Sequence, residues 1–211
     1  MTAPPSPPAT VFLVDDDPSV LRAVGRLVRS AGWQVATFHS PQEFMAGPIA
    51  DAPGCLVLDV TMPGMNGLEL QQALARNDSH LPIIFLTGTG DIPMTVRAIK
   101  GGAVDFLSKP CPPGKLLEVI QQALGRDRQL RLDRAKEQAL ADRLATLTPR
   151  EHEVMLGVVA GKLNKQIAAD LGAAEKTIKI HRARVMAKLG VVSVAELVRL
   201  TQQAGVGSGK K

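Results

Sequence analysis

Short apolar runs alternate with segments of helical periodicity over the first 125 residues of the chain. The runs have the length and composition of buried strands, because each spans only four or five residues and is mostly apolar. They are Thr10–Val14, Gln34–Phe38, Cys55–Leu58, Ile83–Leu86 and Val104–Leu107. Apolar residues at helical spacing predict helices over Pro18–Ser30, Pro41–Ala46, Gly67–Ala75, Ile92–Lys100 and Pro113–Leu124. The alternation predicts an α/β fold, a five-stranded parallel sheet with helices on both faces.

The rest of the chain has an all-helical pattern. Residues 126–145 are highly charged, contain neither Gly nor Pro, and have leucines that do not keep a heptad, so we expect a solvated helical linker. After it, Thr148 and Pro149 suit the start of a helix, and Glu151 can close a capping box. The predicted helices are Pro149–Ala160, Asn164–Leu171, Glu175–Leu189 and Val194–Gln203. The predicted segments are a disordered proline-rich start (1–9), an α/β domain (10–125), the linker (126–145), a small four-helix domain (146–204) and a flexible tail (205–211).

Charge is distributed unevenly along the 211 residues, whose net charge is +5. Residues 1–125 carry 8 basic and 11 acidic side chains (−3), residues 126–145 carry 6 and 4 (+2), and residues 146–211 carry 11 and 5 (+6). A basic terminal third favours a polyanionic partner, with nucleic acid the first candidate, although a solvated surface has the same composition. No apolar run approaches the roughly 18 residues of a membrane span, so we expect no membrane association and a cytoplasmic location. Cys55 and Cys111 have no disulfide or metal-site spacing and are expected to be reduced thiols.

Polar residues with related chemistry follow the predicted strands. Because the carboxyl ends of adjacent parallel strands meet at one edge of a sheet, we expect these side chains to converge. Clustered carboxylates favour a hard divalent cation such as Mg²⁺, and a lysine and a hydroxyl can hold phosphate oxygens while an aspartate acts as nucleophile. The residues are Asp15, Asp16 and Asp17 after the first strand, Asp59 after the third, Thr87 after the fourth and Lys109 after the fifth.

Each of these residues alone has a structural explanation, since an Asp after a strand commonly caps a helix and a Thr commonly bonds backbone. Asp17, followed by Pro18, is explained by an N-cap. Together, the motifs resemble the receiver domain of two-component response regulators, which has a flavodoxin-like sheet, over residues 10 to about 125. The motifs are Val14-Asp15-Asp16, Asp59-Val60-Thr61-Met62-Pro63-Gly64, Thr87-Gly88 and Lys109-Pro110.

The resemblance implies roles for the site residues. Asp59 would be the phosphoryl acceptor, and Thr87 and Lys109 would contact the phosphoryl group. Phe106 occupies the position of the family's aromatic switch, although a core phenylalanine needs no such role. Mg²⁺ (or Mn²⁺) would be bound by Asp15, Asp16, Asp59 and the backbone carbonyl of Thr61.

A second set of motifs marks the basic terminal third: Leu147-Thr148-Pro149-Arg150-Glu151, Gly161, Asn164-Lys165-Gln166-Ile167-Ala168 and Lys176-Thr177-Ile178-Lys179-Ile180-His181. They resemble the LuxR-type helix-turn-helix domain of the NarL/FixJ class over residues 146 to about 203. Independently, a helical projection of residues 175–189 puts Ile178, Val185 and Leu189 on a core face. The opposite face mixes small apolar residues with Lys and Arg, which suits a DNA major groove.

We expect Lys179 and Ile180 at base edges, with Ala183 on the same face. Phosphate contacts are expected from Lys165, Lys176, Thr177 and Arg184. Two positions depart from the family pattern. Ala174 replaces the Ser that usually caps the recognition helix, so about 1 kcal/mol of capping is missing. Val192 replaces an Asn or Arg, which removes one phosphate contact.

The predicted function is a DNA-binding transcriptional regulator, activated when a histidine kinase phosphorylates Asp59. Its expected partners are that kinase, double-stranded promoter DNA, a second copy of the chain when phosphorylated, and RNA polymerase. It is not expected to be an enzyme, apart from phosphoryl transfer onto and off Asp59. Two alternatives stay open: an aspartyl-phosphate phosphohydrolase with its nucleophile in the Asp15-x-Asp17 motif, and a DNA-binding protein that no longer depends on phosphorylation.

Overall fold

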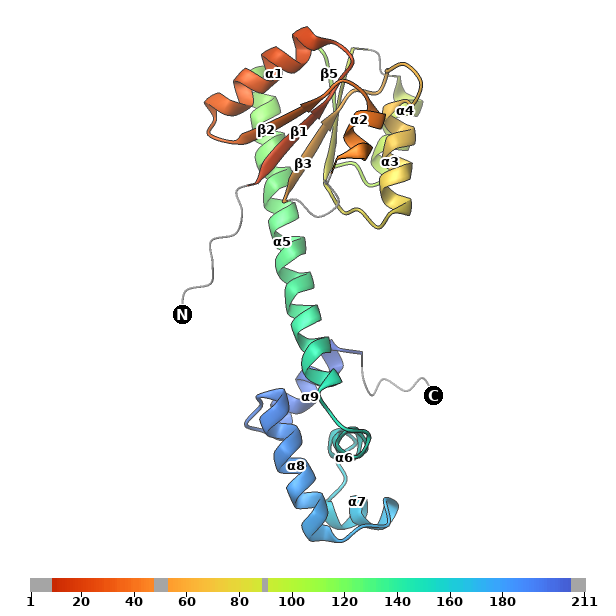
Figure 1. Cartoon of the computed structure of the whole chain (residues 1–211), viewed down its shortest axis with the longest axis vertical. Coiled ribbons are helices and arrows are strands. Elements are labelled where there is room, and N and C mark those ends of the chain that lie inside the picture. The colour runs from red at the N-terminus through yellow and green to blue at the C-terminus, as the bar shows by residue number, and fades with distance from the viewer. Residues whose placement is uncertain (1–8, 48–52, 89–90, 206–211) are drawn as a thin grey trace. The chain divides into compact units, whose positions relative to one another are not determined.

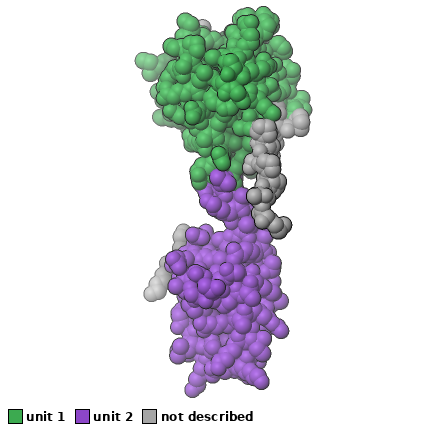
Figure 2. Space-filling model, turned by 90° about the vertical axis from the view of Figure 1, so that its left-hand side faces the viewer, with its two compact units in different colours: residues 1–131 green, residues 132–211 purple. Residues whose placement is uncertain are grey.

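The computed structural model describes residues 9–47, 53–88 and 91–205. It divides the chain into two compact units, residues 1–131 and 132–211 (Figure 2). Within the described residues, the first unit contains a five-stranded parallel sheet in the order β2-β1-β3-β4-β5 (Figure 1). This is the doubly wound, flavodoxin-like order, which confirms the predicted fold class. The strands are β1 (Thr10–Val14), β2 (Gln34–Phe38), β3 (Gly54–Leu58), β4 (Ile83–Thr87) and β5 (Asp105–Ser108).

Helices cover both faces of this sheet (Figure 1). On one face lie α1 (Pro18–Ser30) and the first turns of α5 (Pro113–Ala145), through residues 116–124; on the other lie α2 (Pro41–Ala46), α3 (Gly67–Arg76) and α4 (Ile92–Lys100). Val11 and Leu13 of β1 pack toward α1 and α5, whereas Phe12 and Val14 pack toward the other layer. A central strand that is buried on both sides is apolar throughout, which explains the continuous runs in the sequence.

The strand and helix bounds follow the sequence prediction closely, with two informative differences. β5 begins one residue later than predicted, because Val104 donates its N–H to the Ile83 carbonyl (2.7 Å) and strand pairing starts with Asp105 opposite Ile84. The helix predicted to end at Leu124 instead continues as α5 for 33 residues, so that the predicted linker helix is its second half. Residues 126–145 contain no Gly or Pro that would stop it.

The second unit is helical. Its helices are α6 (Pro149–Val159), α7 (Asn164–Asp170), α8 (Glu175–Leu189) and α9 (Val194–Gln203). The predicted core face of α8 is confirmed, since Ile178, Val185 and Leu189 are at most 1% exposed and pack into the unit's core. The predicted capping box at Thr148 and Glu151 is also present.

The domain bounds drawn from the sequence, 10–125 and 146–204, stay predictions. Apart from Ala9 and Gly205, the segments expected to be disordered lie outside the described residues. Among the described helices, none combines the length and the apolar composition needed to cross a membrane.

Candidate functional site

Three carboxylates meet at the carboxyl edge of the sheet. β1 and β3 are neighbours, and the Asp59 N–H donates to the Val14 carbonyl (2.9 Å), so the residues after both strands lie together. One oxygen atom each of Asp15, Asp16 and Asp59 lies within 4.8 Å of the others. Asp15 and Asp59 are buried, whereas Asp16 is exposed. Carboxylates this close repel one another, and a divalent cation with oxygen ligands relieves that repulsion.

Lys109 brings a positive charge to the same point. Its backbone N–H donates to the Thr87 carbonyl (2.7 Å), which extends the β4–β5 pairing beyond the strand end. Its Nζ lies 2.5 Å from Asp15 Oδ2 and 3.4 Å from Asp59 Oδ1. The predicted convergence of Asp15, Asp59, Thr87 and Lys109 is therefore what the topology produces.

The environment of Asp59 suits a reactive carboxylate. Burial raises the pKa of Asp59 above its usual value, and the Asp15 carboxylate acts in the same direction. The Lys109 charge and a hydrogen bond from Thr87 oppose this shift. Asp59 Oδ1 is buried and makes no hydrogen bond within the part of the chain that the structure describes. A buried oxygen left unsatisfied is costly and fits a cation or an incoming group.

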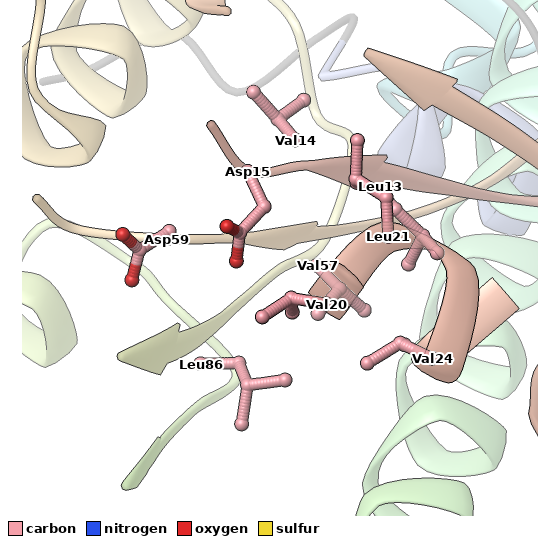
Figure 3. Close-up of a pocket in the computed structure, with 9 residues that line it drawn as sticks. All are labelled: Leu13, Val14, Asp15, Val20, Leu21, Val24, Val57, Asp59 and Leu86. Atoms are coloured by element: carbon pink, nitrogen blue, oxygen red, sulfur yellow. The ribbon is translucent and has the colours of Figure 1, made fainter. Parts of the chain in front are cut away.

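The Asp15 and Asp59 carboxylates adjoin a small pocket with an aliphatic wall. In Figure 3 the Asp15 and Asp59 carboxylates lie side by side, and aliphatic side chains from β1, β3, β4 and α1 surround the adjoining space. Those side chains are Leu13, Val14, Val20, Leu21, Val24, Val57 and Leu86. An aliphatic wall offers no polar group to solvate a carboxylate, so the cluster depends on Lys109 and on what binds from the solvent side.

Gly67 fixes the loop after Asp59, and sequence reasoning did not single it out. A Cβ at position 67 would lie 2.2 Å from the Asp59 carbonyl oxygen, so only glycine allows α3 to start this close to β3. Asn66 caps α3 through a capping box with Glu69. The sequence signal was a good cap residue directly before a glycine. By contrast, a Cβ at Gly88 would meet nothing within 4 Å, which agrees with open space beside Thr87.

The other predicted receiver residues have less decisive positions. Thr61 is exposed on the loop after β3. Phe106 is half-buried, with its ring centroid 5.9 Å from that of Phe85. Asp17 accepts a hydrogen bond from the Ser19 N–H (2.7 Å), which confirms it as the cap of α1.

The predicted DNA-contacting residues form an exposed surface on α7 and α8. Each of the seven is exposed: Lys165, Lys176, Thr177, Lys179, Ile180, Ala183 and Arg184. Ile180 keeps 47% of its surface accessible, so this aliphatic side chain is open to contact with a partner. Arg182 instead donates to Asn164 Oδ1 (3.0 Å) and links α8 to α7, as expected for a structural residue. Ala174 provides no side-chain cap to α8, as predicted.

Comparison with known protein families covers both units. Residues 11–121 match the family described as "Response regulator receiver domain", and residues 145–201 match "Bacterial regulatory proteins, luxR family". The chain is a two-component response regulator of the NarL/FixJ class. The regulator is 48% identical to Nodulation protein W of Bradyrhizobium diazoefficiens, over 95% of this chain and 88% of that protein. It is 39% identical to the transcriptional regulatory protein FixJ of the same organism, over 93% of this chain and 96% of that protein.

Solved structures give the same result. The response regulator StyR superposes with a TM-score of 0.88 at 45% identity, over 93% of this chain and 99% of that one. Full-length FixJ from B. japonicum gives a TM-score of 0.58 at 39% identity, over 93% and 97%.

The regulator also contains buried ionic contacts that the sequence did not reveal. Asp127 of α5 is 4% exposed; it accepts from the Gly54 N–H (3.0 Å) at the start of β3 and from Arg131 (2.9 Å). In the second unit, Lys188 donates to Glu151 (2.6 Å) and to the Thr146 carbonyl (2.9 Å). Asp127 and Arg131 are one helical turn apart, but the contacts with Gly54, Glu151 and Thr146 join residues 37 to 73 positions apart, which no local pattern indicates.

Proposed function

We propose that this response regulator is a transcription factor in which phosphorylation of Asp59 controls dimerisation and promoter binding. The observation that supports this proposal most directly is the position of Asp59, whose buried carboxylate lies beside Asp15, Asp16, Lys109 and Thr87. A structural cluster would satisfy its buried oxygens internally, whereas Asp59 Oδ1 makes no hydrogen bond among the described residues and has only the long contact to Lys109 Nζ (3.4 Å). The domains that carry these roles are residues 10–125 and 146–204, joined by 126–145.

Mg²⁺ (or Mn²⁺) completes the acceptor site. Asp15, Asp16 and Asp59, with the backbone carbonyl of Thr61, are the residues proposed to bind the ion, which supplies positive charge for the phosphoryl oxygens. Hard oxygen donors are the ligands that these ions prefer, and the donor set contains nothing else.

Phosphoryl transfer then needs a nucleophile and groups that stabilise charge. A carboxylate oxygen of Asp59 forms a bond to phosphorus as the P–N bond of the kinase phosphohistidine breaks and the imidazole leaves. Lys109 and the Thr87 hydroxyl hold the phosphoryl oxygens. The chain supplies no other catalysis in this proposal, and its own Asp59 is the substrate.

Phosphorylation of Asp59 changes the surface of the protein at α4. The Thr87 hydroxyl, drawn toward the phosphoryl group, leaves space that Phe106 can enter, and Phe106 packs in the same apolar cluster as Met94 and Ala98 of α4. Ile92, Val96 and Ile99 lie one turn apart along α4 and are 81%, 45% and 45% exposed. Such an apolar stripe on the surface suits association with a second copy of the chain, and two copies would bind paired half-sites.

DNA binding is assigned to α8. Lys179, Ile180 and Ala183 are proposed to face the base edges in the major groove. Lys165, Lys176, Thr177 and Arg184 are proposed to contact phosphates. RNA polymerase is the further partner expected of a promoter-bound regulator, and the cytoplasm is the compartment in which kinase, regulator and promoter meet.

The test is to locate the phosphate. We would treat the full chain with acetyl phosphate and Mg²⁺ and map the acyl phosphate by mass spectrometry, using Asp59→Asn and, as a matched control, Asp17→Asn. We expect label on Asp59 only, lost in Asp59→Asn and kept in Asp17→Asn, because an asparagine still caps α1. Label on Asp15 or Asp17 would support the phosphohydrolase alternative instead.

A second measurement tests coupling to DNA. Phosphodonor should increase dimerisation and promoter affinity in the wild type but not in Asp59→Asn. Val96→Lys should keep the acyl phosphate and lose the dimer, because a charge interrupts the α4 stripe. Equal promoter affinity of the wild type and Asp59→Asn under phosphodonor would contradict the proposal and favour a phosphorylation-independent DNA-binding protein.

A further inference from the structure

The surface of α8 carries one negatively charged residue, although the proposed partner, DNA, is a polyanion. Glu175 is the only acid among the 15 residues of this helix, which also carries Lys and Arg at positions 176, 179, 182, 184 and 188. Its side chain is 50% exposed and lies in the first turn, beside the residues proposed to enter the groove. Phosphates would repel a carboxylate here, so in a DNA complex Glu175 is more favourably placed against a hydrogen-bond donor than against a phosphate.

Lys179 lies next to Glu175 on the same face. The two residues are one turn apart, and Lys179 Nζ is 4.0 Å from Glu175 Oε1. The Lys179 side chain is 67% exposed, so this pair is long, solvated and worth little to the fold. Both groups are therefore available to other partners, and together they present an acceptor and a donor side by side.

That pair of groups complements the edge of one base pair. In the major groove, cytosine offers an amino donor that a glutamate can accept from, and guanine offers the O6 and N7 acceptors for a lysine. The cytosine amino group and guanine O6 are adjacent because they pair with each other. We propose that Glu175 and Lys179 jointly read a single C·G base pair, Glu175 accepting from cytosine and Lys179 donating to guanine.

The inference rests on the proposed function, in that α8 must enter the major groove. An A·T pair also offers an amino donor and a carbonyl acceptor, but guanine gives the lysine two acceptors at once, which favours C·G. Glu175 also stabilises α8 as a negative charge in its first turn. That role would affect stability and would leave the base preference unchanged.

The experiment is selection of binding sites from randomised double-stranded DNA by the full, phosphorylated chain. Glu175→Gln and Lys179→Ala should each lose about ten-fold of the discrimination at one base pair, and the pair should be the same for both. Glu175→Gln should also bind non-specific DNA more tightly, because it removes a negative charge that faces phosphates. Glu153→Gln is the matched control, since Glu153 is also 50% exposed and ion-paired within one turn (2.8 Å to Arg150) but lies on α6. It should select the wild-type sequence.

The outcomes separate the two proposals. If the wild type selects no preferred sequence, the proposed function itself fails. If the wild type selects a sequence that Glu175→Gln selects equally well at every position, this inference is overturned while DNA binding stands. It is also overturned if the two variants affect different base pairs, if the shared pair is A·T, or if Glu175→Gln only lowers the melting temperature.

Discussion

The first turn of α8 lacks a cap that a single substitution can restore. Ala174 already has the extended N-cap conformation (φ −72°, ψ 143°), and its carbonyl accepts from Thr177 N–H (2.9 Å). Its methyl group, however, cannot accept from the first N–H groups of the helix. Serine has the missing acceptor and adds only one atom, so Ala174→Ser should stabilise the second unit by about 1 kcal/mol.

The same unit offers the reverse change as a control. Ser193 caps α9 by accepting from the Glu196 N–H (3.2 Å), so Ser193→Ala should destabilise the unit by about 1 kcal/mol. For a unit of this size, 1 kcal/mol corresponds to about 4–8 °C in melting temperature. The two variants should therefore melt on opposite sides of the wild type.

Two signals separate the units during thermal unfolding of the full chain. Far-UV circular dichroism follows the helices of both units, whereas fluorescence follows Trp33, which is the single tryptophan and lies in the first unit. We expect both substitutions to move the dichroism transition and to leave the fluorescence transition in place. If Ala174→Ser did not move the dichroism transition while Ser193→Ala lowered it, the missing cap would not be a defect of α8.

Three further changes test the acceptor site and the buried ion pair. Asp59→Asn should raise the free energy of unfolding at pH 7, measured with urea, because the raised pKa of Asp59 means that its charged carboxylate opposes folding above about pH 4. Mg²⁺ should stabilise this variant less than it stabilises the wild type. The pKa of Glu151 is lowered to about 2, chiefly by the Lys188 hydrogen bond, so its contribution to stability is complete above its ordinary pKa of 4.5 and disappears as the pH falls toward 2. The deficit of Glu151→Gln against the wild type should therefore shrink over that range in the same assay. Gly67→Ala should cost about 1–3 kcal/mol of stability and slow phosphorylation of Asp59 by acetyl phosphate. Gly125→Ala is the control, since a Cβ there meets nothing within 4 Å, and it should be neutral or stabilising. Equal effects of the two substitutions would contradict the packing argument.

Local patterns sufficed for most of the fold. A buried strand such as β1 is apolar on both faces, and helices such as α1 and α6 have Pro at their first positions and a capping side chain before them. These signals are local, so the sequence contains them in full. The sequence prediction ended this helix at Leu124 and placed a separate helical linker from residue 126. The exposed glycine between them, Gly125, costs only about 1 kcal/mol in a helix, and the residues after it favour helix.

The parts that could not be predicted depend on contacts between distant residues. Asp127 looks like one of many charges on a solvated helix, yet it is buried against the Gly54 N–H. Lys188 looks like a candidate for a phosphate, yet it bonds Glu151 and the Thr146 carbonyl. In both cases residue type and periodicity are the same for the exposed and the buried arrangement, so only the tertiary structure distinguishes them.

The acceptor site lies between these two cases. Its residues were found because each follows a strand and parallel strands align their ends, so that Asp15, Asp59 and Lys109 meet once the strand order is known. What topology alone leaves out is the energetic state of the site: a carboxylate beside an aliphatic pocket, with one buried oxygen that makes no hydrogen bond among the described residues. That state supports the proposed function, because a fully satisfied cluster would only stabilise the fold, whereas a buried oxygen without a hydrogen bond is stabilised by the cation and phosphoryl group that we propose to bind there.

The charge of the second unit follows the same reasoning. Residues 146–211 have an excess of six basic side chains, but Arg150, Lys162 and Lys188 are each held by an acid, Glu153, Asp170 and Glu151 respectively. Most of the other basic side chains that the structure describes lie on α8 or at Lys165 of α7, and Arg199 lies on α9. The α8 surface also exposes Ile180. Net charge therefore points to a polyanionic partner, but the pairing of charges decides which face meets it. On that face Glu175 is the one acid of α8, and its contact with Lys179 is long (4.0 Å) and solvated.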